Sequence, residues 1–298
     1  MSGSKTQEGI AWMVLTGFLF AAVTGIVRHV GSNLPSIEAA FIRYAIGLLL
    51  IAPLIVRHWQ GMPDRRSLKI YTIRGLVHGI AVMLWFYAMA RIPIAEVTAI
   101  GYLAPIFVTI GAAMFLGEKL HLRRIGGIAA GFVGTLIILR PGFESINLGQ
   151  LAQLSAAPLF AVSFLIAKKL TARESSSMIV GMLSIFCTLI LLPGALMVWR
   201  PPTYEEIGWL ALTALVATVG HYTLTRAFQA APISITQPVG FLQLVWAIMI
   251  GFFLFDEAID PFVILGGGII VVAATYIAHR EIVTQRSAQT PSDIATKV

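Results

Sequence analysis

Ten long apolar blocks follow one another along the chain, separated by short polar segments. They cover approximately residues 9–29, 37–56, 70–90, 94–116, 122–139, 149–167, 176–198, 207–229, 233–255 and 261–279. Each is close to the ~20 residues that a helix needs to cross a bilayer. None alternates with period two, as the strands of an outer-membrane barrel do. The pattern predicts an all-α membrane protein with ten transmembrane helices.

The composition supports a membrane protein. Hydrophobic residues make up 57% of the chain, charged residues only 12%, and the mean hydropathy is +0.85. Soluble domains carry about 25% charged residues. The first block is too long, and too closely followed by others, for a cleaved signal peptide. The single cysteine, Cys187, falls inside the seventh block, so no disulfide framework is predicted.

The positive charges are distributed unevenly between the two sides of the predicted bundle. Four bases fall on the side opposite the N-terminus, namely Arg28, Arg91, Arg140 and Arg200. Many more fall on the side of the N-terminus: Lys5, Arg57, Arg65, Arg66, Lys69, Lys119, Arg123, Arg124, Lys168, Lys169, Arg173, Arg280, Arg286 and Lys297. By the positive-inside rule, both termini are cytoplasmic. The net charge of +7 therefore indicates topology, and no nucleic-acid partner is predicted.

One sequence element occurs twice. Residues 115–128 read FLGEKLHLRRIGGI and residues 254–267 read LFDEAIDPFVILGG, which places Glu118 and Gly127 at a constant offset from Glu257 and Gly266. A second match joins the start of the first block to the start of the sixth, where Gly9 and Gly149, and Arg28 and Lys168, correspond. The chain is therefore predicted to be an internal duplication.

Each half holds five helices, so the second half must enter the bilayer upside down. The basic turn at 119–124 is then cytoplasmic and its acidic copy at 256–260 faces outward, as the positive-inside rule requires. We predict a first repeat over 1–145, a second, inverted repeat over 146–283, and a disordered cytoplasmic tail over 284–298. Inverted repeats are typical of secondary transporters, whose substrate site lies at the repeat interface.

The sequence resembles a known family. The stretches LAPIFVTIGAAMFLGEKLHLRRIGGIAAGFVGTLIIL, PISITQPVGFLQLVWAIMIGFFLFDEAIDPFVILGGGIIVVAATYI and FIRYAIGLLLIAPL are similar to the paired EamA-type domains of the drug/metabolite transporter superfamily. The resemblance covers residues 8–280. It implies a ten-helix transporter in the bacterial inner membrane, often an exporter of amino acids or related metabolites.

Polar and aromatic residues inside the blocks are candidates for a substrate cavity, because polar groups at mid-membrane depth are costly and should face the bundle interior. Thr98 and Tyr102 share one face of the fourth block with Pro105 and Thr109, and similar faces recur on other blocks. The predicted cavity residues are Trp12, Thr16, Phe20, His78, Trp85, Thr98, Tyr102, His221, Thr225, Gln237, Phe241, Gln243 and Trp246. Pro105 and Pro158 are predicted hinges, because proline frees a helix carbonyl.

Structural roles compete with these functional ones. Threonine and glutamine also join helices by hydrogen bonds, aromatic rings fill gaps, and His78 could be a satisfied core histidine. Arg43, Arg74 and Arg226 are expected to extend toward the interface from positions near helix ends. Glu118 and Glu257 each precede a helix, where a carboxylate caps free amides, so both are expected to be capping residues.

The predicted function is export of small amphipathic metabolites, with amino acids first, including aromatic or apolar ones. Because every acid lies in a loop, a tail or at a helix end, we expect facilitated diffusion or exchange by alternating access. The alternatives are a proton-coupled exporter of drugs or other metabolites, and, outside transport, a membrane-embedded enzyme or lipid-handling scaffold. No P-loop, metal-ligand cluster or nucleophile elbow is present, so neither an enzyme nor a cofactor is predicted. The predicted partners are a small-molecule substrate and the lipid bilayer.

Overall fold

The computed structural model describes residues 3–31, 33–57, 64–104, 106–107, 110, 122–140, 145–231, 236 and 239–289. All regular structure within these ranges is helical. The helices are α1 (Gly3–Val30), α2 (Ser36–Arg57), α3 (Arg65–Met89), α4 (Ile94–Gly101), α6 (Leu122–Leu139), α7 (Leu148–Leu170), α8 (Ser176–Met197), α9 (Tyr204–Ala230), α11 (Leu242–Phe255) and α12 (Pro261–Gln289).

Each of the ten predicted blocks contains one described helix, which confirms the all-α class. Six of these helices, α1, α2, α3, α7, α8 and α9, are long and apolar enough to cross a membrane. Shorter apolar stretches lie in α6, α11 and α12. The largest differences from the prediction concern the fourth and ninth blocks, where α4 ends at Gly101 and α11 begins only at Leu242.

Side-chain caps define where several helices begin. Asp64 accepts a hydrogen bond from the Ser67 amide (2.8 Å), and hydrogen bonding by the Ser67 side chain and then by its amide holds the pKa of the Asp64 carboxyl below its usual value. Asn147 and Thr203 form reciprocal capping boxes with Gln150 and Glu206. These caps fix the entry points of α3, α7 and α9, three of the helices that surround the central cavity described below.

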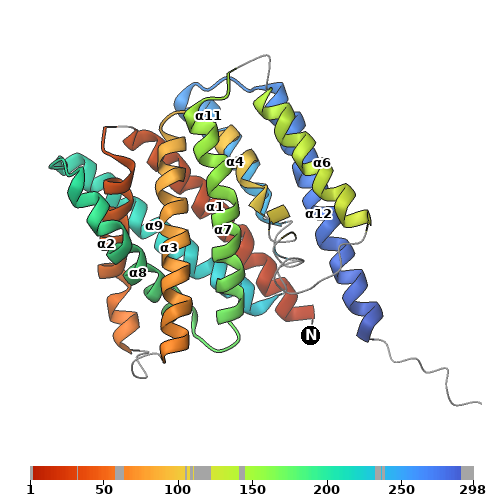
Figure 1. Cartoon of the computed structure of the whole chain (residues 1–298), viewed down its shortest axis with the longest axis horizontal. Helices are drawn as coiled ribbons and strands as arrows, with labels where there is room; N and C mark the ends of the chain where they lie inside the picture. Colours follow the sequence, from red (N-terminus) through yellow and green to blue (C-terminus); the bar gives the residue numbers. More distant parts are fainter. Residues whose placement is uncertain are drawn as a thin grey trace, which may run out of the picture.

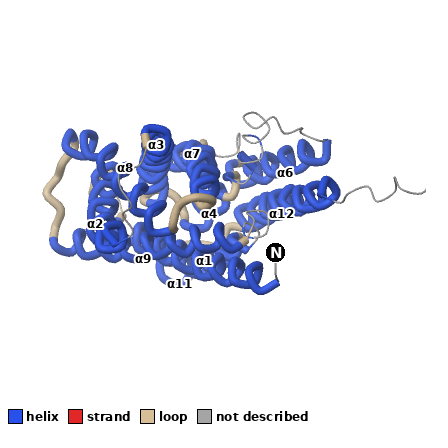
Figure 2. Tube along the Cα trace, turned by 90° about the horizontal axis from the view of Figure 1, so that it is seen from below, coloured by secondary structure: helices blue, strands red, loops and turns tan. Residues whose placement is uncertain are grey.

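The two halves pack against each other helix by helix (Figures 1 and 2). Helix α1 packs on α9, and its counterpart α7 packs on α3. The pairs α2 and α8, α4 and α11, and α6 and α12 each join equivalent helices of the two halves. When the two halves are exchanged, the α1–α9 pair becomes the α7–α3 pair, and each of the other three pairs becomes itself. The core of the molecule is therefore the interface between the repeats.

Equivalent helices run in opposite directions. In Figure 1, α1 starts at the lower face of the bundle, where the N-terminus lies, whereas α7 starts at the upper face and joins α8 at the lower one. We use these two terms below: the upper face holds the α1–α2, α3–α4, α8–α9 and α11–α12 connections. The arrangement is that of an inverted repeat.

The same polar contact recurs at both faces of the bundle. Arg28 donates from Nη1 to the carbonyl oxygens of Met89 (3.0 Å) and Ile92 (3.3 Å), at the end of α3. Its counterpart Lys168 donates from Nζ to the carbonyl oxygens of Phe228 and Ala231, at the end of α9. A cation next to free carbonyls at a helix C-terminus is stabilising. The duplication predicted from sequence thus extends to individual hydrogen bonds.

Helix α12 is longer than predicted. It continues to Gln289, past residue 284, where a disordered tail was predicted to begin. Its last two turns contain no glycine or proline, and the first proline downstream is Pro291, so the sequence offers no earlier stop. Residues 290–298 lie outside the described part of the chain.

Which face of the bundle is cytoplasmic stays a prediction, and thiol labelling tests it. Ala258 in the α11–α12 turn and Ala172 in the α7–α8 connection are both exposed, and the native Cys187 is buried. In a chain with Cys187→Ser, Ala258→Cys should react with an impermeant maleimide in intact cells, and Ala172→Cys should react only after the membrane is opened. The opposite labelling pattern would place the termini outside.

Candidate functional site: a central cavity

A cavity of about 210 Å³ lies at the interface between the two halves. Helices α1, α3 and α4 of the first half and α7, α9 and α11 of the second supply most of its wall. Its lining residues are Met13, Thr16, Gly17, Phe20, Val23, Thr24, Arg43, His78, Val82, Trp85, Phe86, Val97, Thr98, Gly101, Tyr102, Ala104, Gln153, Phe160, Phe164, Ala217, His221, Leu224, Phe228, Gly240, Phe241 and Gln243. The site is thus mainly apolar with a few polar groups, as is typical of small-molecule sites.

A helix break borders the cavity at equivalent positions of the two repeats. Helix α4 ends at Gly101, and the amides of Tyr102 and Leu103 bond three residues back. In the second half Phe241 lies in a turn before α11, and the Leu244 amide bonds to its carbonyl (3.0 Å). The continuous helices predicted over 94–116 and 233–255 are therefore wrong at these points.

The sequence offers a physical reason for both breaks. Proline has no amide hydrogen, so Pro105 cannot donate to the carbonyl of Gly101, and Pro238 creates the same deficit just before the second break. Discontinuous helices at a repeat interface are a common element of transporter substrate sites.

Tyr102 joins the two breaks directly. Its ring meets that of Phe241 at a centroid distance of 4.8 Å and an angle of 78°, and its hydroxyl donates to the Phe241 carbonyl (3.1 Å). Tyr102 and Phe241 are equivalent residues of the two repeats. The pseudo-two-fold axis therefore passes close to this pair, at one wall of the cavity.

Two histidines meet inside the cavity. His78 of α3 and His221 of α9 lie with ring centroids 5.2 Å apart. His78 Nδ1 shares a hydrogen bond with Ser163 Oγ of α7 (2.8 Å), while its Nε2 is buried without a hydrogen-bond partner in the described part of the chain. Phe20 packs on His221 at 5.1 Å and Phe160 on His78 at 5.3 Å. One imidazole nitrogen thus remains available in a largely aromatic setting.

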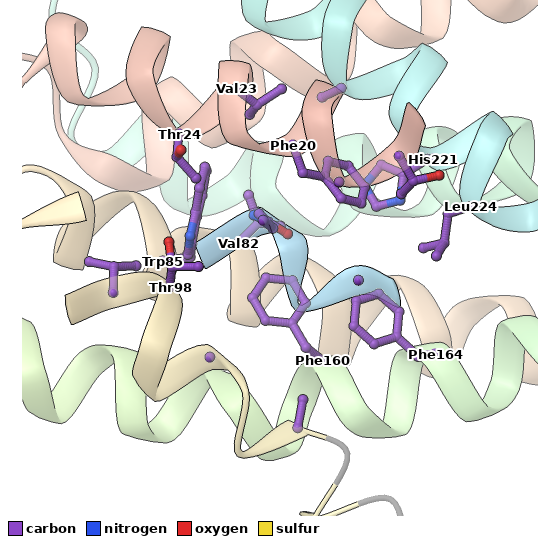
Figure 3. Close-up of a pocket in the computed structure, with 18 of the residues that line it drawn as sticks. Phe20, Val23, Thr24, Val82, Trp85, Thr98, Phe160, Phe164, His221 and Leu224 are labelled. Carbon is purple, nitrogen blue, oxygen red and sulfur yellow. The ribbon is translucent and has the colours of Figure 1, made fainter. Parts of the chain in front are cut away.

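Aromatic rings form the rest of the wall (Figure 3). Phe160 and Phe164 of α7 stack nearly in parallel, with centroids 5.9 Å apart, opposite Phe20 and His221. Trp85 and Thr98 lie at another side of the cavity. The walls can therefore contact a flat or apolar molecule on more than one side.

Most of the predicted cavity residues line this cavity. They are Thr16, Phe20, His78, Trp85, Thr98, Tyr102, His221, Phe241 and Gln243. Some of their polar groups are engaged within the protein: Thr16 Oγ1 bonds Thr223 Oγ1 across α1 and α9 (2.8 Å), and Thr98 Oγ1 donates to the Ile94 carbonyl (2.8 Å). The competing structural role therefore holds for these two hydroxyl groups.

Three predicted residues lie elsewhere. The Trp12 indole donates to Glu8 (3.1 Å) near the lower face, and the Thr225 hydroxyl bonds the His221 carbonyl (2.8 Å). Trp246 lies in a separate apolar groove on α1, α9 and α11, edge-on to Phe18. Trp12 shares a face of α1 with Thr16 and Phe20 but lies nearer the end of the helix, whereas Trp246 lies on a face of α11 that borders the groove. Gln237 and Pro105 lie outside the described residues, and Pro158 lies inside α7.

Several lining residues were not predicted from the sequence, among them Arg43, Gln153, Phe160 and Phe164. Arg43 was expected to extend toward the interface, yet only 5% of its surface is exposed. The sequence held a signal, because Arg43 lies on the same stripe of α2 as Ala40, Gly47 and Ile51, spaced by three or four residues. That stripe of small and apolar residues is the buried face of the helix.

The predicted position of Arg74 is also wrong. Arg74 was expected near the interface but is 3% exposed and donates from Nη1 to the Ile179 carbonyl of α8 (2.8 Å). Helices α3 and α8 pack closely at this level, so its side chain is held between them. Arg226, by contrast, is partly exposed and pairs with Glu8 (3.3 Å), in keeping with a position near the membrane surface.

Glu257 is a capping residue, although it does not cap the helix that follows it. Its Oε2 accepts from the Ile94 amide at the start of α4 (2.9 Å), and its Oε1 lies 3.1 Å from Arg28 Nη2. Helix α12 is capped instead by Asp260, which accepts from the Phe262 amide (2.8 Å). Glu257 therefore links the second half to α1 and α4 of the first. Glu118 lies outside the described residues.

Inverted halves of membrane-spanning helices around a central cavity define the architecture of a secondary transporter. The EamA-like transporter family matches the chain twice, over residues 7–140 and 147–278, and the chain belongs to this family. It is therefore a multi-pass membrane protein of the drug/metabolite transporter superfamily.

Named relatives carry different solutes. The chain is 28% identical to the S-adenosylmethionine uptake transporter of Rickettsia bellii (92% of this chain, 94% of the relative) and 29% identical to the pseudopaline exporter CntI of Pseudomonas aeruginosa (92% and 96%). It is 30% identical to the riboflavin transporter of Rhizobium johnstonii (95% of each). A solved crystal structure shares the fold, with a TM-score of 0.60 and 18% identity over 94% of this chain and 99% of that one.

Proposed function

We propose that the protein is a bacterial inner-membrane exporter of small amphipathic metabolites, with amino acids bearing aromatic or apolar side chains as the first candidates. The observation that carries this proposal is the central cavity. Its volume of about 210 Å³ lies below the roughly 300–1,000 Å³ of pockets for drug-sized ligands, which favours a small substrate. Its aromatic walls suit an apolar side chain, and its few polar groups suit a polar end.

Alternating access would expose the cavity to each face in turn. The equivalent contacts of Arg28 and Lys168 lie at the two faces, and the equivalent helix breaks at Tyr102 and Phe241 meet at the cavity between them. We propose facilitated diffusion or exchange, since no carboxylate lies among the described residues that line the cavity and a buried acid is the usual group for proton exchange.

Counterflow in liposomes that contain only this protein tests the proposal. The vesicles are preloaded with one unlabelled amino acid and receive a trace of its labelled form, with no pH gradient and no membrane potential. Labelled phenylalanine, leucine or methionine should accumulate transiently, and empty liposomes should show none. A panel in which no amino acid exchanges, alongside turnover of a lipid, would favour an embedded enzyme or lipid-handling scaffold.

The histidine pair supports a second candidate, a proton-coupled exporter of drugs or other metabolites. His78 and His221 lie in contact within the cavity, and imidazole is the side chain best suited to exchange protons near neutral pH. In this case transport would require a pH gradient and would lose that requirement in His78→Gln and His221→Gln. Counterflow that persists without any gradient speaks against this candidate.

Two tryptophans, one in the cavity wall and one outside it, test whether the wall contacts substrate. Trp85→Ala should raise the KM for transport about three- to tenfold, because a lost aromatic contact is worth roughly 0.5–1.5 kcal/mol. Trp246→Ala removes a ring of the same size from the separate groove and should leave KM unchanged. Equal effects of the two substitutions would mean that Trp85 does not contact substrate.

A further inference from the structure

Arg43 is a buried cation in the wall of the central cavity. It extends from the second turn of α2, lies on the buried stripe of that helix and is 5% exposed. Its guanidinium carbon lies 3.9 Å from the centre of the neighbouring Tyr44 ring, a cation–π contact. A charge held at this depth is costly unless it has a partner or a function.

No carboxylate in the described part of the chain pairs with Arg43. The ion pairs described there join Arg28 to Glu257, Arg140 to Asp260, Arg200 to Glu206 and Arg226 to Glu8. Arg74, the other deeply buried arginine, has a carbonyl acceptor. The described cavity lining contains no Asp or Glu. Arg43 thus faces the cavity as a positive charge without a protein anion.

Two further polar atoms of the cavity are buried and unpartnered among the described residues. They are His78 Nε2 and Gln153 Oε1, on side chains that are 0% and 2% exposed. A Cβ at Gly101 would lie 3.1 Å from Gln153 Nε2, so a glycine there leaves room for the amide. A buried polar group without a hydrogen-bond partner is destabilising, and a ligand that bonds to it removes this cost.

We propose that Arg43 binds a carboxylate of the transported molecule. This inference rests on the proposed transport function and names the substrate class: small acids with one carboxylate and an apolar or aromatic body, amino acids among them. Guanidinium matches a carboxylate with charge-assisted, often bidentate hydrogen bonds. The aromatic walls hold the body of the molecule, and Gln153 Oε1 is an acceptor for its remaining donors.

Binding to the purified protein in nanodiscs tests the proposal without transport. The probes share one ring and differ in one group: phenylalanine against phenylalaninamide, and 3-phenylpropionate against phenethylamine. Affinity is measured by quenching of tryptophan fluorescence and by the shift in melting temperature. The wild-type protein should bind each carboxylate at least about tenfold more tightly than its partner, since charge-assisted hydrogen bonds are the strongest available here.

Substitutions then assign the effect to Arg43. Arg43→Gln should abolish the preference for the carboxylates, and Arg43→Lys should retain part of it. The matched control is Arg91→Gln, because Arg91 also lies over an adjacent tyrosine ring, 3.6 Å from the centre of Tyr87, but is exposed and outside the cavity. Arg91→Gln should keep the wild-type preference.

The outcomes separate this inference from the proposed function. Equal binding of acid, amide and amine by the wild-type protein overturns the assignment of Arg43, even if amino acids are transported. This test uses the wild-type protein alone, so it does not depend on whether a variant folds. A preference that persists in Arg43→Gln also overturns it. Binding of carboxylates in a protein that exchanges no amino acid supports the inference and removes the amino-acid proposal.

Discussion

Glu257→Ala should lower the free energy of unfolding by about 2–4 kcal/mol, because it breaks a mostly buried ion pair and removes a helix cap in one step. The carboxylate holds Arg28 Nη2 at 3.1 Å and accepts from the Ile94 amide at 2.9 Å. The side chains of Arg28 and Glu257 are only 24% and 10% exposed. Without Glu257 the guanidinium keeps two carbonyl acceptors but no negative charge.

Unfolding of the purified protein in mixed micelles, titrated with SDS, measures this loss. Glu257→Gln should fall between wild type and alanine, because the amide keeps an oxygen for the Ile94 amide but has no charge. Glu205→Ala is the matched control, since it removes an exposed carboxylate from the upper face and should change stability by less than about 0.5 kcal/mol. Equal stability of Glu257→Ala and Glu205→Ala would show that the contact contributes nothing.

Gly134→Ala is expected to destabilise the pair of helices α6 and α12 by about 1–3 kcal/mol through overpacking. A Cβ at Gly134 would lie 2.6 Å from the backbone oxygen of Gly266 and 2.8 Å from Ile270 Cγ1. A Cβ at Gly266 would in turn meet the backbone oxygen of Gly134. Backbone atoms cannot rotate away, so the helices must separate. This close crossing is the small-residue contact on which membrane helices depend.

Two glycines of the same helices provide the controls. A Cβ at Gly126 of α6 or Gly268 of α12 would have no heavy atom within 4 Å. Gly126→Ala and Gly268→Ala should therefore be neutral or stabilising by up to about 1 kcal/mol, through helix propensity alone. The melting temperatures of the three alanine variants and of the wild-type protein are compared in one detergent. Equal melting of Gly134→Ala and Gly126→Ala would mean that the crossing tolerates a methyl group.

Hydropathy predicted the helices because burying apolar side chains in lipid depends on composition over a whole block. It could not predict the rotation of each helix about its axis, which depends on the neighbours. Thr16 and Phe20 of α1 line the cavity, whereas Trp12, one turn earlier on the same face, lies near the lower surface with Glu8. These residues differ in depth along the helix axis, which the face of the helix alone does not specify.

Contacts between residues far apart in the chain also could not be predicted from the sequence. The sequence identified Glu257 as a cap, but its acceptor role at Ile94 joins residues 163 positions apart. Arg43 was misplaced because depth alone suggested extension to the interface, although its spacing from Gly47 and Ile51 carried the correct information. The helix breaks at Tyr102 and Phe241 were also readable in principle, from glycine and proline at 101, 105, 238 and 240.

The backbone of the cavity repeats, but its chemistry does not. Helices α2 and α8 begin and end at equivalent positions, and the residue equivalent to Arg43 is Leu183. His78 and His221 correspond to Ala217 and Val82 rather than to each other. A two-fold symmetric cavity would accept a molecule equally well in either of two poses related by the axis. The two ends of this cavity differ chemically, so we expect a bound molecule to take a single polarity along the bundle and to leave with a defined end first.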